Sequence, residues 1–243
     1  MERHFEQELE KLNKRILKMG NLVTEQVHNS LDALLTGNIE LAQQVIEVDN
    51  KVDKLDVKID KLCQRIFALT QPVATDLRLI MSALKMNNDL ERMGDHAVNI
   101  ASKVEIISDY KDVLSELQIT EVIHLVDLIV KDVITILNSR NTAFVKDIFT
   151  LANTIEEKVQ GVSARIIDEM MHKSEVIVVA TQLIIVLQTI ERLAAYSTNI
   201  AESIIFIVDG KLVKHKKAFS GSSIEMDGKE AEALPLQPDP EQG

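Results

Sequence analysis

The chain has 243 residues, of which 46% are hydrophobic and 3% aromatic, and its formal net charge is −11. A composition without Trp, with eight Gly and four Pro, is typical of packed helices and excludes an all-β fold, which needs more turn residues. The surplus of acid excludes a nucleic-acid-binding protein, because phosphate backbones are held by clustered Lys and Arg.

Four breaks, at residues 36–38, 71–72, 138–141 and 173–174, together with the boundary between the two halves near residue 110, divide the chain up to residue 210 into six helical stretches. In the second, third and sixth stretches the apolar residues are spaced mostly four and three apart, which predicts the packed faces of a left-handed bundle. The predicted core residues of the second stretch are Val48, Val52, Leu55, Ile59, Leu62, Ile66 and Leu69. Those of the third are Leu79, Ala83, Met86, Leu90, Met93, Ala97, Ile100 and Val104. Those of the sixth are Val179, Leu183, Val186, Ile190, Leu193, Ile200 and Ile204.

The sequence Glu-Arg-x6-Asn-Ile-Ala occurs twice, beginning at Glu91 and again at Glu191, an offset of 100 residues. A repeat of that length is a whole small bundle, so we predict an all-α fold of two tandem three-helix bundles. The first bundle is expected at residues 1–110 and the second at 111–210. Residues 211–243 are expected to form a basic and then a disordered acidic tail, because the periodicity stops there.

Location in the cell can be inferred from three negative features. The single Cys63 permits no intramolecular disulfide, and the first residues form no apolar leader, so we expect a cytoplasmic protein. The near-apolar run 176–190 is shorter than the roughly 20 residues that a bilayer span needs, and we expect it to be a buried helix.

Carboxylates gather on two of the predicted helices. On the third stretch, Glu91 and Asp95 lie one turn apart on the face opposite the apolar residues. Oxygen ligands with no thiolate nearby suit hard or borderline metal ions. The alternative is an ordinary solvated helix face, on which like charges repel by roughly a few tenths of a kcal/mol per pair. The second stretch carries four aspartates along one edge: Asp49, Asp53, Asp56 and Asp60.

Two Glu-x-x-His pairs, Glu25 with His28 and Glu121 with His124, suggest a competing hypothesis, the di-iron centre of ferritin-like bundles. The apolar spacing of both helices places these pairs on outer faces, whereas di-iron ligands project into one core. No Gly-rich phosphate loop or nucleophile–histidine arrangement is present. We therefore expect no enzyme, with a carboxylate-bound metal enzyme, di-iron or phosphate-ester hydrolase, as the alternative.

Several segments resemble the PhoU family of phosphate-uptake regulators. They are residues 49–53 (DNKVD), residues 76–78 (DLR) after Gln71 and Pro72, residues 89–95 (DLERMGD) with Asn99, and the second-copy segments 190–193 and 199–202. The resemblance covers about residues 4–217. It implies a usually dimeric protein that restrains phosphate import and the Pho regulon. Its implied partners are the ATPase subunit of the phosphate ABC transporter and the phosphate-sensing histidine kinase, with membrane association through them.

The resemblance also implies surface metal sites, for Fe, Mn, Mg, Ca or Zn. Carried over by position, the first-copy ligands are Asp49, Asp53, Glu91 and Asp95. In the second copy the position of Asp95 is Ala195, and only Glu156 remains of the aspartate ladder, whether the offset is 100 or 103. Glu156 and Glu191 are therefore weaker candidates. The remaining motif residues, for which a structural role is expected, are Arg78, Arg92, Asn99, Arg192 and Asn199.

Overall fold

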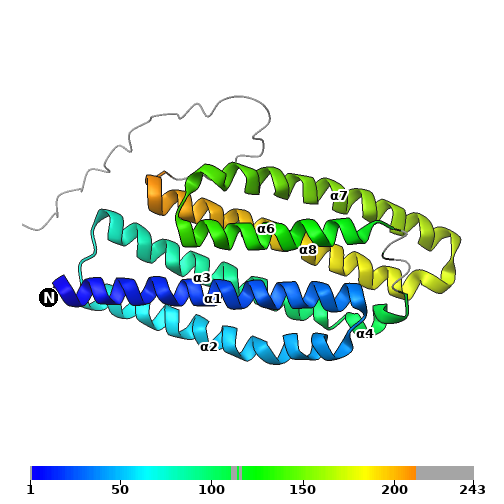
Figure 1. Ribbon diagram of the computed structural model, residues 1–243, viewed down its shortest axis with the longest axis horizontal. Coiled ribbons are helices and arrows are strands. Elements are labelled where there is room, and N and C mark those ends of the chain that lie inside the picture. The colour runs from blue at the N-terminus through cyan, green and yellow to red at the C-terminus, as the bar shows by residue number, and fades with distance from the viewer. Residues whose placement is uncertain (1, 111–113, 115–116, 212–243) are drawn as a thin grey trace, which may run out of the picture.

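The computed structural model describes residues 2–110, 114 and 117–211, and within these ranges the chain is helical with no strand (Figure 1). The all-α prediction is confirmed. Six long helices are present: α1 (Glu2–Thr36), α2 (Ile39–Leu69), α3 (Ala74–Ala101), α6 (Ile119–Ser139), α7 (Val145–His172) and α8 (Ile177–Asp209). The short elements are α4 (Val104–Ile107) and three 3₁₀ turns, η1 (Ser108–Tyr110), η2 (Thr142–Phe144) and η3 (Ser174–Val176).

The helices end where the sequence supplies capping residues. Gly37 follows α1 with φ 68°, a left-handed conformation that glycine adopts without strain. Asn38 then caps α2, since its Oδ1 accepts from the backbone N–H of Leu41 at 3.0 Å. At the other end of the chain, Gly210 stops α8 in the same left-handed region.

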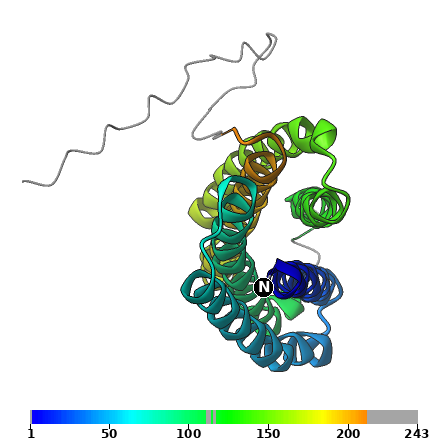
Figure 2. The same ribbon diagram turned by 90° about the vertical axis from the view of Figure 1, so that its left-hand side faces the viewer.

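The six helices form two bundles packed side by side, α1–α2–α3 and α6–α7–α8. Seen down the helices, α2, α3, α8 and α7 follow one another in a curved outer layer, while α1 and α6 lie next to each other on its inner side (Figure 2). The bundles therefore meet along two helix pairs, α1 with α6 and α3 with α8. The predicted boundary at residues 110 and 111 stays a prediction, and all of the predicted tail except Lys211 lies outside the described residues.

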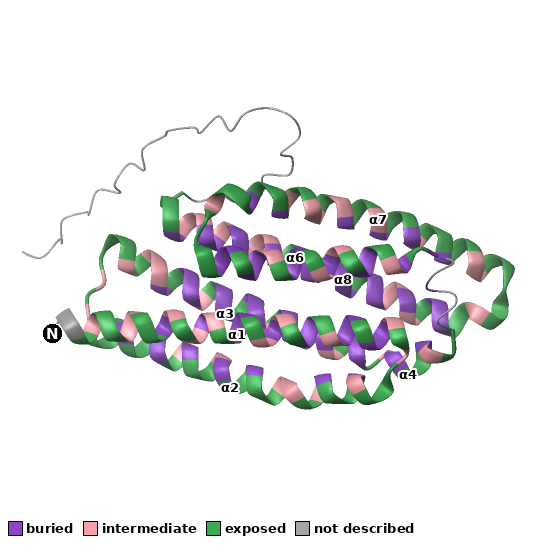
Figure 3. Cartoon of the chain, in the orientation of Figure 1, coloured by how far each residue is buried: buried purple, intermediate pink, exposed green. Residues whose placement is uncertain are grey.

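The core follows the predicted apolar faces (Figure 3). All seven predicted positions of α8 are buried, and so are most of those on α2 and α3. Leu69 was expected in the core and is 67% exposed, because it is the last residue of α2 and lies beyond the packed turns. Val104 is buried but belongs to α4, since α3 ends at Ala101.

The segment Ser174–Asp209, which contains α8, is long and apolar enough to cross a membrane by length and composition. In the structure α8 packs against α3, α6 and α7, at the centre of the outer layer (Figure 2). A core helix of a water-soluble bundle passes the same test of length and composition. One face of α8 is buried here, as expected, whereas Ile177 and Val178 at its start are exposed.

Candidate functional site

The four carboxylates predicted as first-copy metal ligands come together where α2 and α3 pack against each other. With Asp56 of α2 they form a group of five that we call the acidic seam: Asp49, Asp53, Asp56, Glu91 and Asp95. Asn87 of α3 fixes the register of the two helices, because its Nδ2 donates to Asp56 Oδ1 at 2.7 Å and to Asp60 Oδ1 at 3.1 Å. Asn87 is 1% exposed, so this contact belongs to the core edge of the seam.

A buried glutamine of α1 closes the other end of the acidic seam. Gln26 is 2% exposed, and its Nε2 donates to Asp49 Oδ1 at 2.9 Å and to the carbonyl of Val45 at 3.3 Å. Gly94 of α3 makes room for this pair. A Cβ at Gly94 would lie 3.2 Å from Gln26 Oε1 and 3.4 Å from Asp49 Oδ1, so a larger residue would crowd both.

The seam carboxylates act on one another electrostatically. Burial raises the pKa of Asp49, the hydrogen bond from Gln26 opposes the rise, and the charges of Asp53 and Asp95 add to it. Burial likewise raises the pKa of Glu91, with Asp95 the next largest contribution. The pKa of Asp56 is also raised, first by burial. Negative charges held close together in partial shelter from water favour a cation.

The seam as it stands is not a complete coordination site. Within the described residues, no three His, Cys, Asp or Glu side chains gather closely enough to hold one metal ion. Asp53 and Asp95 are exposed and free of packing restraint, whereas Gln26 Oε1 is buried without a hydrogen-bond partner. The donor set is all oxygen, which fits a hard ion, and rotation of exposed carboxylates would be needed to complete it.

The second copy replaces this polar cluster with apolar residues. Buried residues of α1 recur in α6 at an offset of 103, and those of α3 recur in α8 at an offset of 100. For α2 and α7 the offset of 103 relates the two capping asparagines, Asn38 and Asn141. At these offsets Gln26 corresponds to Ile129 and Asn87 to Leu187, both 0% exposed. The five seam carboxylates correspond, in the order given above, to Ala152, Glu156, Val159, Glu191 and Ala195.

The two second-copy candidates are therefore isolated. Glu156 and Glu191 are exposed, and neither takes part in a hydrogen bond or ion pair with another described residue. The helix ends select between the two registers that the sequence left open for α7. Asn38 before α2 and Asn141 before the η2 turn both accept a capping hydrogen bond, and the last helical residues are Leu69 and His172, so both ends are related by the offset of 103.

The duplicated motif lies where α3 and α8 meet. Asn199 Nδ2 donates to Asp89 Oδ1 at 3.4 Å, and Thr189 Oγ1 donates to Asn99 Oδ1 at 3.5 Å. Because residues 89 and 189, like 99 and 199, are related by the offset of 100, the two contacts are images of each other. His96 and Tyr196 are also equivalent positions, and the centres of their rings lie 5.6 Å apart. The motif thus joins the two copies about a pseudo-twofold axis.

Asp89 is a residue that the sequence did not single out. It is 4% exposed, and its Oδ2 has no hydrogen-bond partner. Burial raises its pKa to about 6, opposed by Lys85 and by the hydrogen bond from Asn199, while Glu202 adds to the rise. The equivalent position holds an uncharged Thr189. The two contacts therefore lie at equivalent positions, but only one of them contains an ionisable group.

The three motif arginines have separate environments. Arg92 Nε lies 3.8 Å from Glu91 Oε2, a loose pair with its own neighbour. Arg192 forms no ion pair with another residue that the structure describes. Arg78 Nη2 donates to Thr75 Oγ1 at 3.3 Å, and its guanidinium lies next to Gly210 at the end of α8.

The Glu-x-x-His pairs do not converge on a common point. Glu25, His28, Glu121 and His124 are all exposed, as the apolar spacing predicted. Glu121 pairs with Lys158 at 2.8 Å, and His28 contacts Asp127 of α6. Di-iron ligands must project into one bundle core, and these side chains do not.

Comparison with known proteins places this architecture in a family. The family model described as the PhoU domain matches residues 16–104 and again 119–204. A protein of Aquifex aeolicus, named phosphate-specific transport system accessory protein PhoU homolog, is 32% identical over 209 residues, which is 86% of this chain and 95% of that protein.

Two crystal structures have the same fold. PhoU from Pseudomonas aeruginosa superposes with a TM-score of 0.80 at 29% identity and covers 85% of this chain and 100% of that one. The phosphate transport system regulatory protein PhoU from Streptococcus pneumoniae gives a TM-score of 0.78 at 30% identity and covers 86% and 99%. With both copies of the domain matched and nearly the full length of these relatives aligned, the chain belongs to the PhoU family.

Proposed function

We propose that this chain is an accessory protein of phosphate-specific transport, which restrains high-affinity uptake and the Pho regulon when phosphate is plentiful. The observation that carries the proposal is the match of both bundles to the PhoU domain, together with relatives named as accessory or regulatory proteins of phosphate transport. The proposed action is non-enzymatic and takes place in the cytoplasm.

In this proposal the helical surfaces act as an adaptor. The partners are the ATPase subunit of the phosphate ABC transporter and the phosphate-sensing histidine kinase, and the chain reaches the membrane through them, as a homodimer. Exposed helix faces on both sides of the two packed layers support such a role, because two partners can then be held without competing for one surface (Figure 2).

The test is a pull-down with purified, tagged chain, using the transporter's ATPase subunit and the kinase as separate prey at low and high phosphate. Binding of either partner that strengthens at high phosphate is the expected result. The nucleotide-binding subunit of an unrelated transporter is the control. Absence of binding to both partners at every phosphate level would refute the adaptor role.

We further propose that the acidic seam binds a metal ion, Fe, Mn, Mg, Ca or Zn, through Asp49, Asp53, Glu91 and Asp95. The mutual repulsion of its carboxylates and the unpartnered Gln26 Oε1 support it. The experiment is elemental analysis of protein purified without chelator. We expect bound metal in the parent chain and in Glu156→Gln/Glu191→Gln, and its loss in Glu91→Gln/Asp95→Asn. Equal metal in all three proteins would end the assignment.

A further inference from the structure

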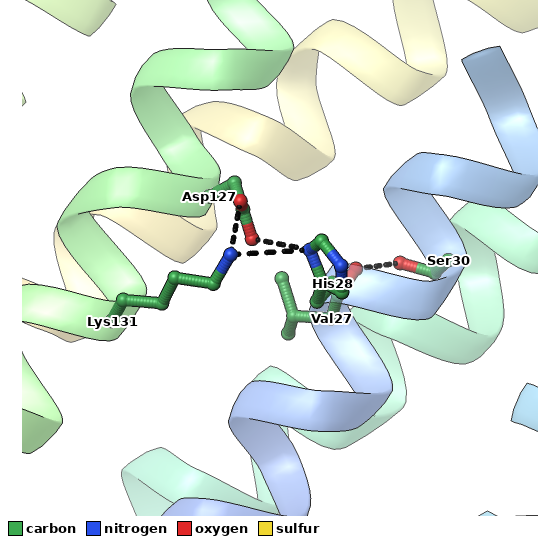
Figure 4. Close-up of polar contacts among 5 residues, drawn as sticks. All are labelled: Val27, His28, Ser30, Asp127 and Lys131. Atoms are coloured by element: carbon green, nitrogen blue, oxygen red, sulfur yellow. Dashed lines mark hydrogen bonds and ion pairs between the residues drawn. The ribbon is translucent and has the colours of Figure 1, made fainter.

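A histidine, an aspartate and a lysine meet where α1 and α6 lie side by side (Figure 4). Asp127 Oδ1 lies 3.0 Å from His28 Nδ1, and Lys131 Nζ lies 2.6 Å from Asp127 Oδ2 and 3.3 Å from His28 Nδ1. The His28 side chain is 49% exposed and that of Asp127 is 21% exposed. Both of these contacts of the imidazole are made by Nδ1.

The geometry selects the tautomer of His28. Nδ1 can donate to Asp127 or accept from Lys131, but not both. The contact with the carboxylate is the shorter one, and a carboxylate is a strong charge-assisted acceptor. Lys131 also has its own short contact with Asp127, which holds the carboxylate in place. In the neutral imidazole this arrangement favours the proton on Nδ1, which leaves the lone pair on Nε2.

A lone pair on Nε2 that is backed by a carboxylate at Nδ1 has three common uses. A metal ligand needs further ligands, and within the described residues no three such side chains gather. A general base needs a bound substrate, whereas His28 stands half exposed on the surface of a helix. The remaining use is that of a surface nucleophile, which reacts with a donor brought by another molecule.

We propose that His28 Nε2 accepts a phosphoryl group from a donor with a phosphorus–nitrogen bond, such as a phosphohistidine on a partner protein. The donor carries a proton on its leaving amine or imidazole. The Nε2 lone pair attacks phosphorus, the N–P bond of the donor breaks, and the donor nitrogen leaves with that electron pair as a neutral amine or imidazole. The imidazole gains a positive charge, which the Asp127 carboxylate offsets through the Nδ1 proton. This site does not depend on the proposed role in phosphate transport.

Two exposed carboxylates flank the site on α1. Glu25 and Asp32 lie one turn before and one turn after His28, and they repel an anionic donor. On the other side, the positive charge of Lys131 lies 3.3 Å from the imidazole. Because the repelling charges are exposed, screening by salt should speed the reaction with a small anionic donor.

The test incubates the intact chain with phosphoramidate and follows acid-labile phosphate by phosphorus NMR and by peptide mass spectrometry. We expect phosphorylation at His28 on nitrogen, and its loss in His28→Gln. The matched control is His124→Gln. His124 is also exposed on α6 but forms no hydrogen bond or ion pair with a described residue. Phosphorylation of the His124→Gln variant should therefore be unchanged.

Asp127 is a positioning residue, and its role is tested separately. Asp127→Asn should slow phosphorylation by about tenfold or more, and Asp127→Glu should recover part of the rate, with unchanged helical content by circular dichroism. The proposal is overturned if His28 is phosphorylated no faster than His124, or if Asp127→Asn reacts at the parental rate.

Discussion

The α2–α3 contact of the first bundle and the α7–α8 contact of the second occupy equivalent places in the fold and differ in their chemistry. The first holds a buried glutamine, a buried asparagine and five carboxylates, while the equivalent positions of the second are mostly apolar. The buried positions of α3 recur in α8 at the offset of 100. Folding therefore constrains the apolar positions of each copy, and leaves the helix contact free to acquire polar groups in one of them.

The largest expected effect tests whether the cores are equivalent. Leu90 and Ile190 occupy matching positions and are both 0% exposed. Leu90→Ala and Ile190→Ala should each lower the free energy of unfolding by about 3 kcal/mol, through lost burial and the cavity left behind. Urea denaturation measures both. A large loss in only one of them would show that the bundles do not share the stability equally.

A smaller effect is expected from the charge that distinguishes Asp89 from Thr189. The folded pKa of Asp89, about 6, lies above its ordinary value of 3.8, so the folded state binds the proton more tightly. Stability is therefore lost as pH rises from about 4 to about 6, and the loss persists above that range. Asp89→Asn should raise the free energy of unfolding by up to about 2 kcal/mol at pH 7.5, and by much less at pH 4.

Denaturation of parent and variant at the two pH values checks this prediction. Asp109→Asn, at an exposed position, serves as the control and should change little. A gain from Asp89→Asn of the same size at both pH values would contradict the assignment of a buried charge.

The pseudo-symmetry of the α3–α8 contact predicts a matched pair of modest effects. Asn99→Ala and Asn199→Ala each remove one partner from contacts that are images of each other, at 3.5 and 3.4 Å. Each should cost about 0.5–1 kcal/mol, with the larger cost for Asn199, whose partner is a buried carboxylate. Thermal unfolding of the two variants and of the double variant measures this. Stability unchanged in both would remove the structural role of the motif.

The smallest effect is expected when the equivalent residues Glu91 and Glu191 are compared. The pKa of Glu91 is raised by burial and by neighbouring carboxylates, so at neutral pH its charge opposes folding. Glu91→Gln should raise stability by roughly a few tenths of a kcal/mol in chelated protein, whereas Glu191→Gln should have no measurable effect. Stabilisation by added metal should be lost in Glu91→Gln. An equal change in stability for Glu91→Gln and Glu191→Gln would contradict the proposed difference between the acidic seam and its second-copy equivalent.

Most of the fold could be predicted from the sequence because its signals are local. The breaks at residues 36–38 and 71–72 carry capping or helix-breaking residues, and the apolar spacing of α3 and α8 identifies their packed faces. The register of α7 could not be chosen in this way, because α7 lacks a motif to anchor the comparison with α2. In the structure, four residues separate α2 from α3, whereas Lys173 alone separates α7 from the η3 turn that leads into α8, and this difference of three changes the offset from 103 to 100.

The candidate site was only partly accessible to sequence analysis. Glu91 and Asp95 could be identified from helical spacing within one element. Gln26 and Asn87 were missed because their burial depends on neighbouring helices. A polar residue within an apolar face was the available signal: Gln26 lies directly before Val27, which is fully buried.

The reciprocal contact between α3 and α8 has a consequence for how such a chain arises. A polypeptide of one copy alone would leave the polar face of its third helix uncovered, and a second molecule of the same polypeptide would offer the matching face. The tandem chain then corresponds to two such polypeptides joined into one. Once they are joined, the sequence of each half can change independently of the other. Thr189 opposite Asp89 is such a change, and a symmetric pair of separate subunits could not carry it.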